Sequence, residues 1–289
     1  MSVRKALRSR LAEDRVLVLP GAADAITARV IEETGFEAIY VTGAGFANAS
    51  FGRPDIGLIT LTEVRDHVRR IADVVKVPLV VDADTGYGGV LNVSRAVREL
   101  EDAGAAAIQI EDQAEPKRCG HFDGNTLISP DEMVRKLTAA LEARRDPDLV
   151  LIARTDAYQS EGLEGAVSRA QQYVAAGADA LFIEAPTSLA DLKLLPSLID
   201  APLIANMVEG GKTPLTNAAE LGEMGYRVAL FANTALRSAV HAVQESMRVL
   251  AEEGDTKSLW SKMLTWEERQ RLIGLPEMQA LEARLLGLD

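Results

Sequence analysis

The sequence is nearly devoid of cysteine and histidine, and these scarcities exclude several classes of protein. A single cysteine, Cys119, cannot form an internal disulfide, so a reducing compartment such as the cytoplasm is expected. The three histidines, His67, His121 and His241, lack the spacing of zinc ligands, so a zinc site is not expected. There is neither a G-x-S-x-G elbow nor a cysteine-hydrolase pattern, which argues against acyl transfer.

Positive charge and long apolar runs are lacking too. Lys and Arg total 31 against 43 Asp and Glu, a formal net charge of -12 that does not resemble a nucleic-acid-binding protein. No run approaches the roughly 18 apolar residues of a membrane span. Residues 1–10 carry charges but lack the apolar segment of a signal peptide. We therefore expect a soluble cytoplasmic protein whose partners include neither nucleic acid nor a membrane.

The sequence does contain a repeated alternation of apolar runs and helix-like segments. The apolar runs are continuous rather than alternating, which is typical of parallel strands buried on both faces. Amphipathic segments such as 92–103 and 165–176 lie between the runs. The eight runs span residues 16–21, 38–43, 78–84, 106–112, 150–156, 180–185, 202–207 and 227–233. Glycines suited to helix C-termini follow several of the amphipathic segments, at Gly35, Gly104, Gly177 and Gly225.

Eight such units predict an α/β fold, a TIM (β/α)8 barrel. A doubly wound open sheet is the alternative, although no Gly-rich dinucleotide fingerprint follows the first run. No linker divides the chain, so we expect a single domain, 1–289, with 234–289 as a C-terminal helical extension. That extension begins with a long helix at 234–253 and exceeds what closing a barrel requires. Its apolar residues predict oligomerisation, with packing on its own barrel as the alternative.

Polar residues cluster where the predicted strands end. In a TIM barrel these carboxyl ends meet at the face that carries the active site. Any one such residue could be a helix cap, but their coincidence on several strands indicates a functional site. The polar strand ends are Tyr40, Thr42, Asp82, Asp84, Glu111, Asp112, Arg154, Asp156, Glu184 and Asn206.

The segment Asp82-Ala83-Asp84-Thr85-Gly86-Tyr87-Gly88 predicts a metal site. Two carboxylates two residues apart share one side of a strand, and Glu111 on the next strand can join them. An all-oxygen acidic cluster suits Mg²⁺ or Mn²⁺. Arg154 supplies a planar fork that matches a carboxylate. Metal and arginine together predict a small anionic substrate, a carboxylate or a phosphonate.

Cys119 lies in a polar segment, 113–129, after the fourth run and before a helix that begins near Pro130. This composition is typical of a mobile active-site loop. Lys117, Arg118 and His121 surround the cysteine, and nearby positive charge lowers the pKa of a thiol. Burial as a small apolar residue is the alternative. Beside a metal that stabilises an enolate, we expect the thiol to donate a proton to carbon.

At these positions nearly the whole chain resembles the isocitrate lyase / phosphoenolpyruvate mutase superfamily. The loop 116–121 is similar to that of its carbon–carbon lyases, 2-methylisocitrate and 2,3-dimethylmalate lyase above all, and to that of carboxyphosphonoenolpyruvate mutase. Phosphoenolpyruvate mutase and the oxaloacetate decarboxylases lack the cysteine. The motifs that carry the resemblance are 82–88 (DADTGYG), 111–113 (EDQ), 116–121 (PKRCGH), 153–156 (ARTD) and 206–214 (NMVEGGKTP).

The resemblance implies roles for particular residues. Asp82 and Asp84 match the Mg²⁺ carboxylates, with Asp55 and Glu111 acting nearby through water. Segment 40–44 matches the part that holds the substrate carboxylate through backbone N–H groups and a hydroxyl, here from Thr42, Gly43 and Ala44; the lyases often have Ser-Gly-Gly there. The remaining substrate-binding residues are expected to be Gly120, Arg154, Glu184, Asn206 and Thr213. A last helix swapped between subunits, in a tetramer built as a dimer of dimers, is also implied.

The function that these expectations describe is reversible cleavage of a 2-hydroxy di- or tricarboxylate to a 2-oxo acid such as pyruvate and a carboxylate. Tyr40 is the candidate base for the hydroxyl proton, Cys119 the acid, and Lys117 and His121 the groups that act with the cysteine. A phosphonomutase that acts on a P–C bond is the first alternative. A catalytically silent barrel that serves as a binding module is the second.

Overall fold

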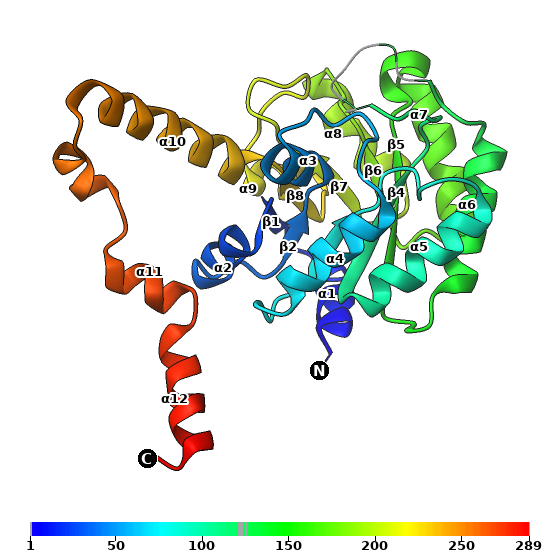
Figure 1. Cartoon of the computed structure of the whole chain (residues 1–289). Helices are drawn as coiled ribbons and strands as arrows, with labels where there is room; N and C mark the ends of the chain where they lie inside the picture. The colour runs from blue at the N-terminus through cyan, green and yellow to red at the C-terminus, as the bar shows by residue number, and fades with distance from the viewer. Residues whose placement is uncertain (1, 119, 121–123, 125, 289) are drawn as a thin grey trace. The chain divides into compact units, whose positions relative to one another are not determined.

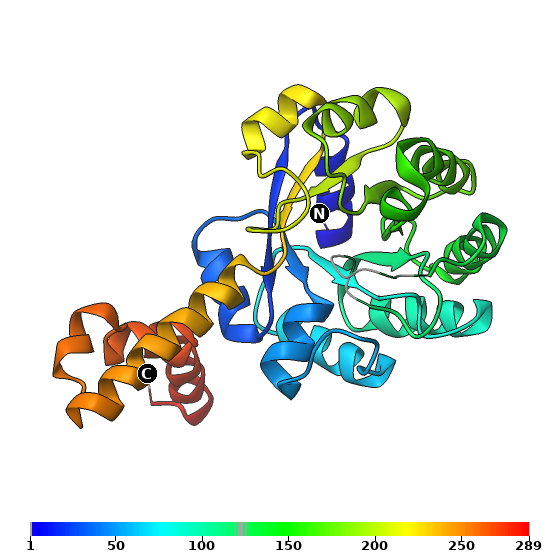
Figure 2. The same ribbon diagram turned by 90° about the horizontal axis from the view of Figure 1, so that it is seen from above.

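Eight parallel strands close into a barrel in the computed structural model, which describes residues 2–118, 120, 124 and 126–288. Each strand pairs with its neighbour in chain order, and β1 pairs with β8, as Figure 2 shows from above. The closure confirms the TIM barrel and rules out the open sheet. The strands are β1 (Leu17–Ala22), β2 (Ile39–Val41), β3 (Leu79–Asp82), β4 (Ala105–Glu111), β5 (Val150–Thr155), β6 (Ala180–Ile183), β7 (Leu203–Asn206) and β8 (Val228–Phe231).

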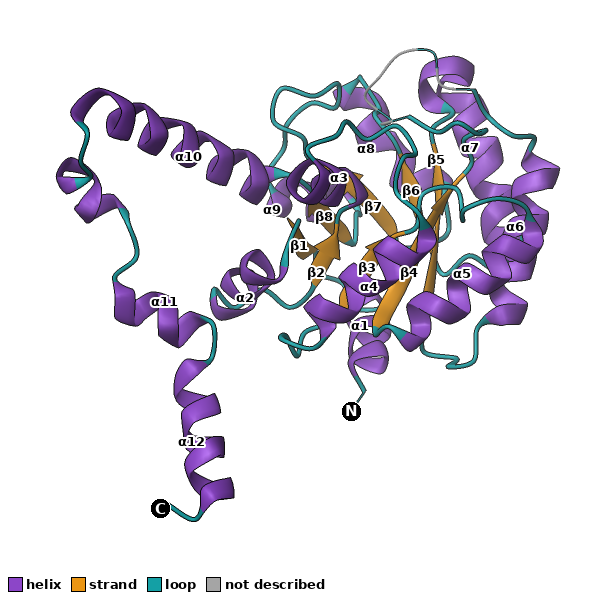
Figure 3. Ribbon diagram, in the orientation of Figure 1, coloured by secondary structure: helices purple, strands orange, loops and turns teal. Residues whose placement is uncertain are grey.

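Helices follow the strands and cover the outside of the barrel, as Figures 1 and 3 show. Most of them begin at a side chain that accepts a backbone N–H group; Ser129, for example, caps the helix that starts at Pro130. The glycines expected at helix ends have φ between 95° and 108°, a region that glycine adopts without strain. The helices of this part are α1 (Val3–Leu11), α2 (Ala25–Glu33), α3 (Gly43–Phe51), α4 (Leu61–Ala72), α5 (Val90–Asp102), α6 (Pro130–Ala143), α7 (Tyr158–Ala175), α8 (Leu189–Leu198) and α9 (Ala218–Met224).

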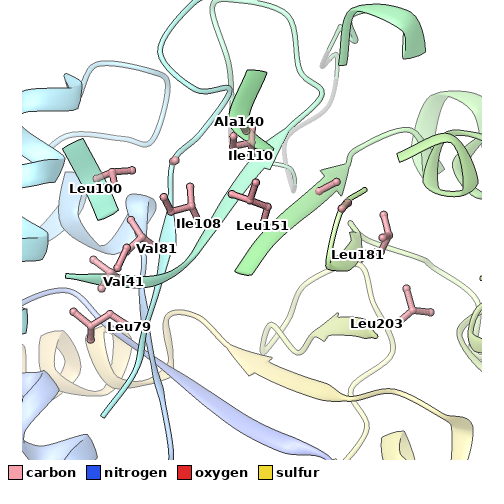
Figure 4. Close-up of a cluster of buried hydrophobic side chains, with 14 of the residues drawn as sticks. Val41, Leu79, Val81, Leu100, Ile108, Ile110, Ala140, Leu151, Leu181 and Leu203 are labelled. Carbon is pink, nitrogen blue, oxygen red and sulfur yellow. The ribbon is translucent and has the colours of Figure 1, made fainter. Parts of the chain in front are cut away.

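The core has two layers, one on each face of the sheet. The outer layer lies between strands and helices, where Leu100 of α5 and Ala140 of α6 pack near Ile108 and Ile110 of β4 (Figure 4). The inner layer fills the barrel with side chains such as Phe182. Burial on both faces explains why the strands read as continuous apolar runs. The filled interior leaves the carboxyl ends of the strands as the place for chemistry.

The chain divides into two compact units, 1–234 and 235–289. The second contains most of α10 (Thr234–Glu253), the 3₁₀ helix η1 (Lys257–Lys262), α11 (Trp266–Leu272) and α12 (Leu275–Leu286). The long helix lies where the sequence predicts it. Large apolar side chains of this unit are exposed, Trp260 to 73 % and Leu285 to 75 %. Among the described residues, no helix is long and apolar enough to cross a membrane.

Candidate active site

The polar residues predicted at the strand ends lie at one end of the barrel. The register pairs Glu111 of β4 with Arg154 of β5, and Asp82 of β3 with Gln109 of β4. Tyr40 of β2 and Asn206 of β7 complete the ring from other strands. These side chains are buried among one another. Strands distant in sequence therefore supply one concentrated set of charged and polar groups.

Asp82 and Asp84 form an acidic pair, but only Asp82 belongs to the strand. β3 ends at Asp82, and Asp84 lies in the following turn with φ of +48°. The backbone N–H of Asp84 donates to Oδ1 of Asp82 at 3.2 Å, and that of Gly43 lies 3.4 Å from Oδ2. The expectation that alternation along a strand aligns the two carboxylates is therefore wrong. A turn in the left-handed region brings them together instead.

Lys117 places its ammonium group between Asp84 of this pair and Asp55. Its Nζ lies 2.6 Å from Oδ1 of Asp84 and also pairs with Asp55. The side chain is almost fully buried. Lys117 thereby brings Asp55, predicted as part of the metal site, beside Asp84. The sequence predicts catalytic help for Cys119 from Lys117, whereas the structure places the lysine among the carboxylates.

Burial makes these carboxylates hard to ionise without a cation. The pKa of Asp84 is raised from 3.8 to about 7, mainly by burial, while Lys117 opposes the increase and Asp82 and Asp55 add to it. Burial also raises the pKa of Glu111 well above its ordinary value, and Arg154 opposes this. A bound divalent cation would stabilise the ionised forms of both.

The donor set fits Mg²⁺ in part. Oε1 of Glu111 is buried and has no hydrogen-bond partner, as expected of an oxygen reserved for a cation or for its water. Within residues 2–118, 120, 124 and 126–288, no group of three or more His, Cys, Asp or Glu side chains is arranged to hold a metal ion by itself. Mg²⁺ usually takes one or two carboxylates and completes its shell with water and substrate oxygens. Asp82 and Asp84 suit that mode of binding.

Arg154 is a second buried cation at this cluster, where it faces Glu111. Its Nε and Nη2 donate to Asp156 at 3.0 and 2.8 Å, a two-point contact that fixes the guanidinium plane. Nη2 also lies 3.1 Å from Glu184, and the group lies over the ring of Phe182. Burial alone would lower the pKa of Arg154, but the surrounding carboxylates raise it, so the guanidinium stays charged.

Tyr40 is poorly suited to the role of ionised base that the sequence suggested. The residue is 3 % exposed, and burial raises the pKa of its hydroxyl well above 10, with the charge of Asp82 adding to the effect. A neutral phenol in this position can donate or accept a hydrogen bond. The pKa therefore favours a hydrogen-bonding role for Tyr40.

The segment expected to hold a substrate carboxylate begins α3. The hydroxyl of Thr42 accepts the N–H of Gly45 at 3.1 Å and donates to Oδ1 of Asn233 at 3.3 Å, so it caps the helix. The adjacent N–H of Gly43 faces the acidic pair, and Ala44 follows in the first helical turn. Asn233, two residues after β8, is the neighbour that orients Thr42.

The loop after β4 reaches the site at Gly120. A Cβ on Gly120 would lie 2.3 Å from Nη2 of Arg154 and 2.5 Å from Oδ1 of Asp156, so only glycine fits. Its carbonyl accepts a hydrogen bond from Gln159 at 3.1 Å. The predicted catalytic residues Cys119 and His121 lie outside the described residues. Gln159 was not predicted, because its sequence position in a helix gives no signal of this contact.

Asn206 and Thr213 contribute unpaired polar atoms. Nδ2 of Asn206 lies 3.4 Å from Glu184, whereas Oδ1 of Asn206 and Oγ1 of Thr213 are buried and have no hydrogen-bond partner. Both polar atoms of Gln109, inside the barrel on β4, are in the same situation. The sequence signal for Gln109 was a lone amide within an apolar run. Buried polar atoms without partners are typical of sites that complete their hydrogen bonds with a ligand or water.

Comparison with known proteins gives the family. A family model described as phosphoenolpyruvate phosphomutase matches residues 7–251. The 2-methylisocitrate lyase of Aeropyrum pernix is 46 % identical over 279 residues, 96 % of this chain and 90 % of that protein. The 2,3-dimethylmalate lyase of Eubacterium barkeri is 40 % identical over 282 residues, 98 % of each chain.

A solved structure agrees with these relatives. A crystal structure of 2,3-dimethylmalate lyase, described as a PEP mutase/isocitrate lyase superfamily member, aligns with a TM-score of 0.93 and 39 % identity. The alignment covers 99 % of this chain and 96 % of that one. The chain therefore belongs to the phosphoenolpyruvate mutase / isocitrate lyase superfamily.

Proposed function

We propose that this protein is a Mg²⁺-dependent carbon–carbon lyase of the cytoplasm. Its substrate is a 2-hydroxy di- or tricarboxylate similar to 2-methylisocitrate or 2,3-dimethylmalate, and its products are a 2-oxo acid such as pyruvate and a second carboxylate. The observation that carries the proposal is the buried acidic cluster of Asp82, Asp84 and Glu111 opposite the buried guanidinium of Arg154. Such a site offers both a cation position and an anion position.

Members of this superfamily depend on a metal ion. Asp82 and Asp84 would hold Mg²⁺, and Asp55 and Glu111 would bind its waters. The ion supplies Lewis acidity toward the hydroxyl and carboxylate oxygens of the substrate. Lys117 occupies part of this acidic cluster and would have to share Asp84 with the ion. In the absence of the ion, the ammonium group of Lys117 balances part of the negative charge of the carboxylates.

The chain's own residues orient the substrate. Arg154 binds a carboxylate, since its planar group is charged and held in one orientation by Asp156. Tyr40 donates a hydrogen bond to oxygen, and Asn206 and Thr213 use their unpaired oxygens for the hydroxyl groups of the substrate. Fixed groups of this kind stabilise the negative charge that develops as the C–C bond breaks.

Cys119 completes the reaction in this proposal. The thiol donates its proton to the carbon that leaves as an enolate-like carboxylate, and His121 acts beside it. The hydroxyl proton of the substrate passes to Glu111, whose Oε1 is unpaired and whose pKa burial raises. Lys117 acts from its position beside Asp84. Gly120, next in the chain, lies so close to Arg154 that a Cβ there would be 2.3 Å from Nη2, which supports a position for the thiol near the substrate carboxylate. Exclusion of water from the covered site prevents unselective protonation of the enolate.

A panel of 2-hydroxy di- and tricarboxylates, assayed for release of pyruvate or glyoxylate with Mg²⁺ present, tests this function. Cleavage of at least one member, abolished by EDTA, is the expected result. A phosphonomutase of the carboxyphosphonoenolpyruvate type is the second candidate, because the same metal site and a similar cysteine loop serve P–C chemistry. Phosphorus NMR with a phosphonate substrate distinguishes the two, since only the mutase rearranges the phosphorus bond.

We also propose that the protein is a homotetramer, a dimer of dimers that exchange their C-terminal helices. The second unit supports this, because its large apolar side chains are exposed in the single chain, Trp266 to 66 % and Leu288 to 72 %. Exposed apolar surface of this kind typically marks an interface.

A further inference from the structure

Asp112 is a buried carboxylate that the proposed reaction does not use. It directly follows Glu111, but it lies on the other face of the sheet, where its side chain meets Tyr173 and Arg169 of α7. The residue has 0 % exposure. Burial of a carboxylate costs free energy unless hydrogen bonds or ion pairs compensate. The partners of Asp112 therefore indicate what the residue does.

Four donors converge on this one side chain. Oδ2 accepts from the hydroxyls of Thr155 and Tyr173 at 2.7 and 2.8 Å and from Nη1 of Arg169 at 3.3 Å. Oδ1 accepts the backbone N–H of Asp156 at 3.0 Å. A carboxyl group with four donors around it acts here as an acceptor. Burial and the charge of Asp156 raise the pKa of Asp112, while the hydrogen bonds from Asp156, Thr155 and Tyr173 oppose the increase. An amide at this position would direct its NH₂ group at one or more of them.

The contacts of Asp112 fix the chain around Arg154. Its backbone N–H donates to the carbonyl of Arg154 at 3.2 Å, and its side chain holds the next two residues, Thr155 and Asp156. Asp156 in turn holds the guanidinium of Arg154 at two points. Asp112 therefore touches three consecutive residues of the β5 end without touching the guanidinium itself.

The same residue also holds the chain segment before α6. The N–H of Ile128 donates to the carbonyl of Asp112 at 3.0 Å, and Nη1 of Arg169 donates to the carbonyl of Ile128 at 2.9 Å. Arg169 is itself held by Glu161, whose two oxygens lie 2.6 and 2.8 Å away. This buried network leaves the end of β5 little freedom to shift.

We propose that Asp112 is a positioning residue that sets the orientation of the Arg154 guanidinium through the backbone of Asp156. The inference rests on the proposed function, since it concerns the substrate carboxylate that Arg154 binds. A planar guanidinium matches a carboxylate at two points in only one orientation. Displacement by about 1 Å of a group that orients substrate can cost a hundredfold in rate. Asp112 does not contact the substrate in this proposal, but it controls the orientation of the guanidinium that binds the substrate carboxylate.

The test compares Asp112→Asn and Tyr173→Phe with the control Tyr226→Phe in the full-length protein. Tyr173 and Tyr226 are both buried, and each hydroxyl donates one hydrogen bond, to Asp112 and to the carbonyl of Leu192 respectively. Calorimetry measures the Kd of pyruvate with Mg²⁺ present, and thermal unfolding measures stability. Kinetics on a substrate that the panel identifies separate KM from kcat.

Asp112→Asn is expected to raise the Kd of pyruvate and the KM at least tenfold, and Tyr173→Phe severalfold. Tyr226→Phe should lower the unfolding temperature about as much as Tyr173→Phe but leave Kd and KM unchanged. Equal Kd values for wild type, Asp112→Asn and Tyr173→Phe would overturn the inference while the proposed function stands. If Asp112→Asn does not fold, the comparison of Kd and KM between Tyr173→Phe and Tyr226→Phe tests the inference. Equal values in these two variants would then overturn it. A wild type that binds no pyruvate overturns the proposed function and the inference with it.

Discussion

Nζ of Lys117 lies 2.6 Å from Oδ1 of Asp84, inside the acidic cluster that we assign to Mg²⁺. A lysine from the loop after β4 thus occupies the cation position between the carboxylates of two other segments. The neighbouring carboxylates raise the pKa of Lys117 against the effect of burial, so its ammonium stays charged. This pairing links the loop to the proposed metal position.

Stability of the metal-free protein should depend on pH through Asp84. The folded protein keeps the Asp84 proton up to about pH 7, whereas the unfolded chain loses it near the ordinary pKa of 3.8. Since the folded state binds more protons between these values, the free energy of unfolding should fall as pH rises from about 4 to about 7 and then level off. Thermal unfolding in EDTA measures this dependence, and Asp84→Asn should reduce it.

Binding of Mg²⁺ should show the opposite trend. The ion binds the ionised carboxylate, so the increase in unfolding temperature caused by Mg²⁺ should be larger at pH 8 than at pH 6. An equal increase at both pH values, or one that persists in Asp84→Asn, would contradict the assignment of Asp84 to the metal.

Removal of the thiol should separate binding from turnover. Cys119→Ser is expected to keep the Mg²⁺ and pyruvate affinities but to lose about 10² to 10⁴ in kcat, since a serine hydroxyl is a far weaker proton donor. Calorimetry and steady-state kinetics measure the two effects. Because Cys119 is the only cysteine, no second thiol complicates the comparison. Unchanged turnover would disprove the role of the thiol as the acid.

Gly120 should not tolerate a side chain. The Cβ of Gly120→Ala would lie 2.3 Å from Nη2 of Arg154 and 2.7 Å from Cγ of Glu184, so the loop or the guanidinium must move. We expect kcat/KM to fall about a hundredfold with little change in stability. Gly89→Ala is the matched control, because nothing lies within 4 Å of its Cβ. Similar kcat/KM values for both variants would show that Gly120 does not lie against the substrate site during turnover.

Tyr40→Phe tests hydrogen bonding against base catalysis. If the neutral hydroxyl donates a hydrogen bond to a charged oxygen, kcat should fall about ten- to a hundredfold while the shape of the pH–rate profile stays the same. The pKa of Tyr40, far above 10, leaves no phenolate near neutral pH. Loss of an ionisation from the profile of the variant would instead identify Tyr40 as the base.

The exposed apolar surface of the second unit should hold subunits together. Light scattering of the intact protein is expected to give four times the chain mass of 31.1 kDa. Leu281→Lys combined with Leu285→Lys, at positions exposed to 45 % and 75 % in the single chain, should shift the protein toward smaller assemblies. A wild type that measures 31.1 kDa would contradict the tetramer.

The local pattern of the sequence was enough to predict the barrel. All eight apolar runs are strands, the helix at 234–253 has the predicted bounds, and Gly35 and Gly104 follow helices with positive φ. These features depend on neighbouring residues alone: buried parallel strands need continuous apolar side chains, and a helix end needs a residue that tolerates the left-handed region. In a TIM barrel the carboxyl ends of all strands meet at one face, so the sequence was enough to predict that Asp82, Glu111 and Arg154 share one site.

Only the tertiary structure decided how those residues act on one another. Glu111 and Asp112 are adjacent in sequence, yet one faces Arg154 and the other is bonded to α7, because successive side chains of a strand point to opposite faces. The position of Lys117 beside Asp84 and the high pKa of Tyr40 arise from burial and from charges on other strands. Sequence determines which groups stand at the barrel end, and packing determines their charge, partners and orientation, since those depend on distances between segments far apart in the chain.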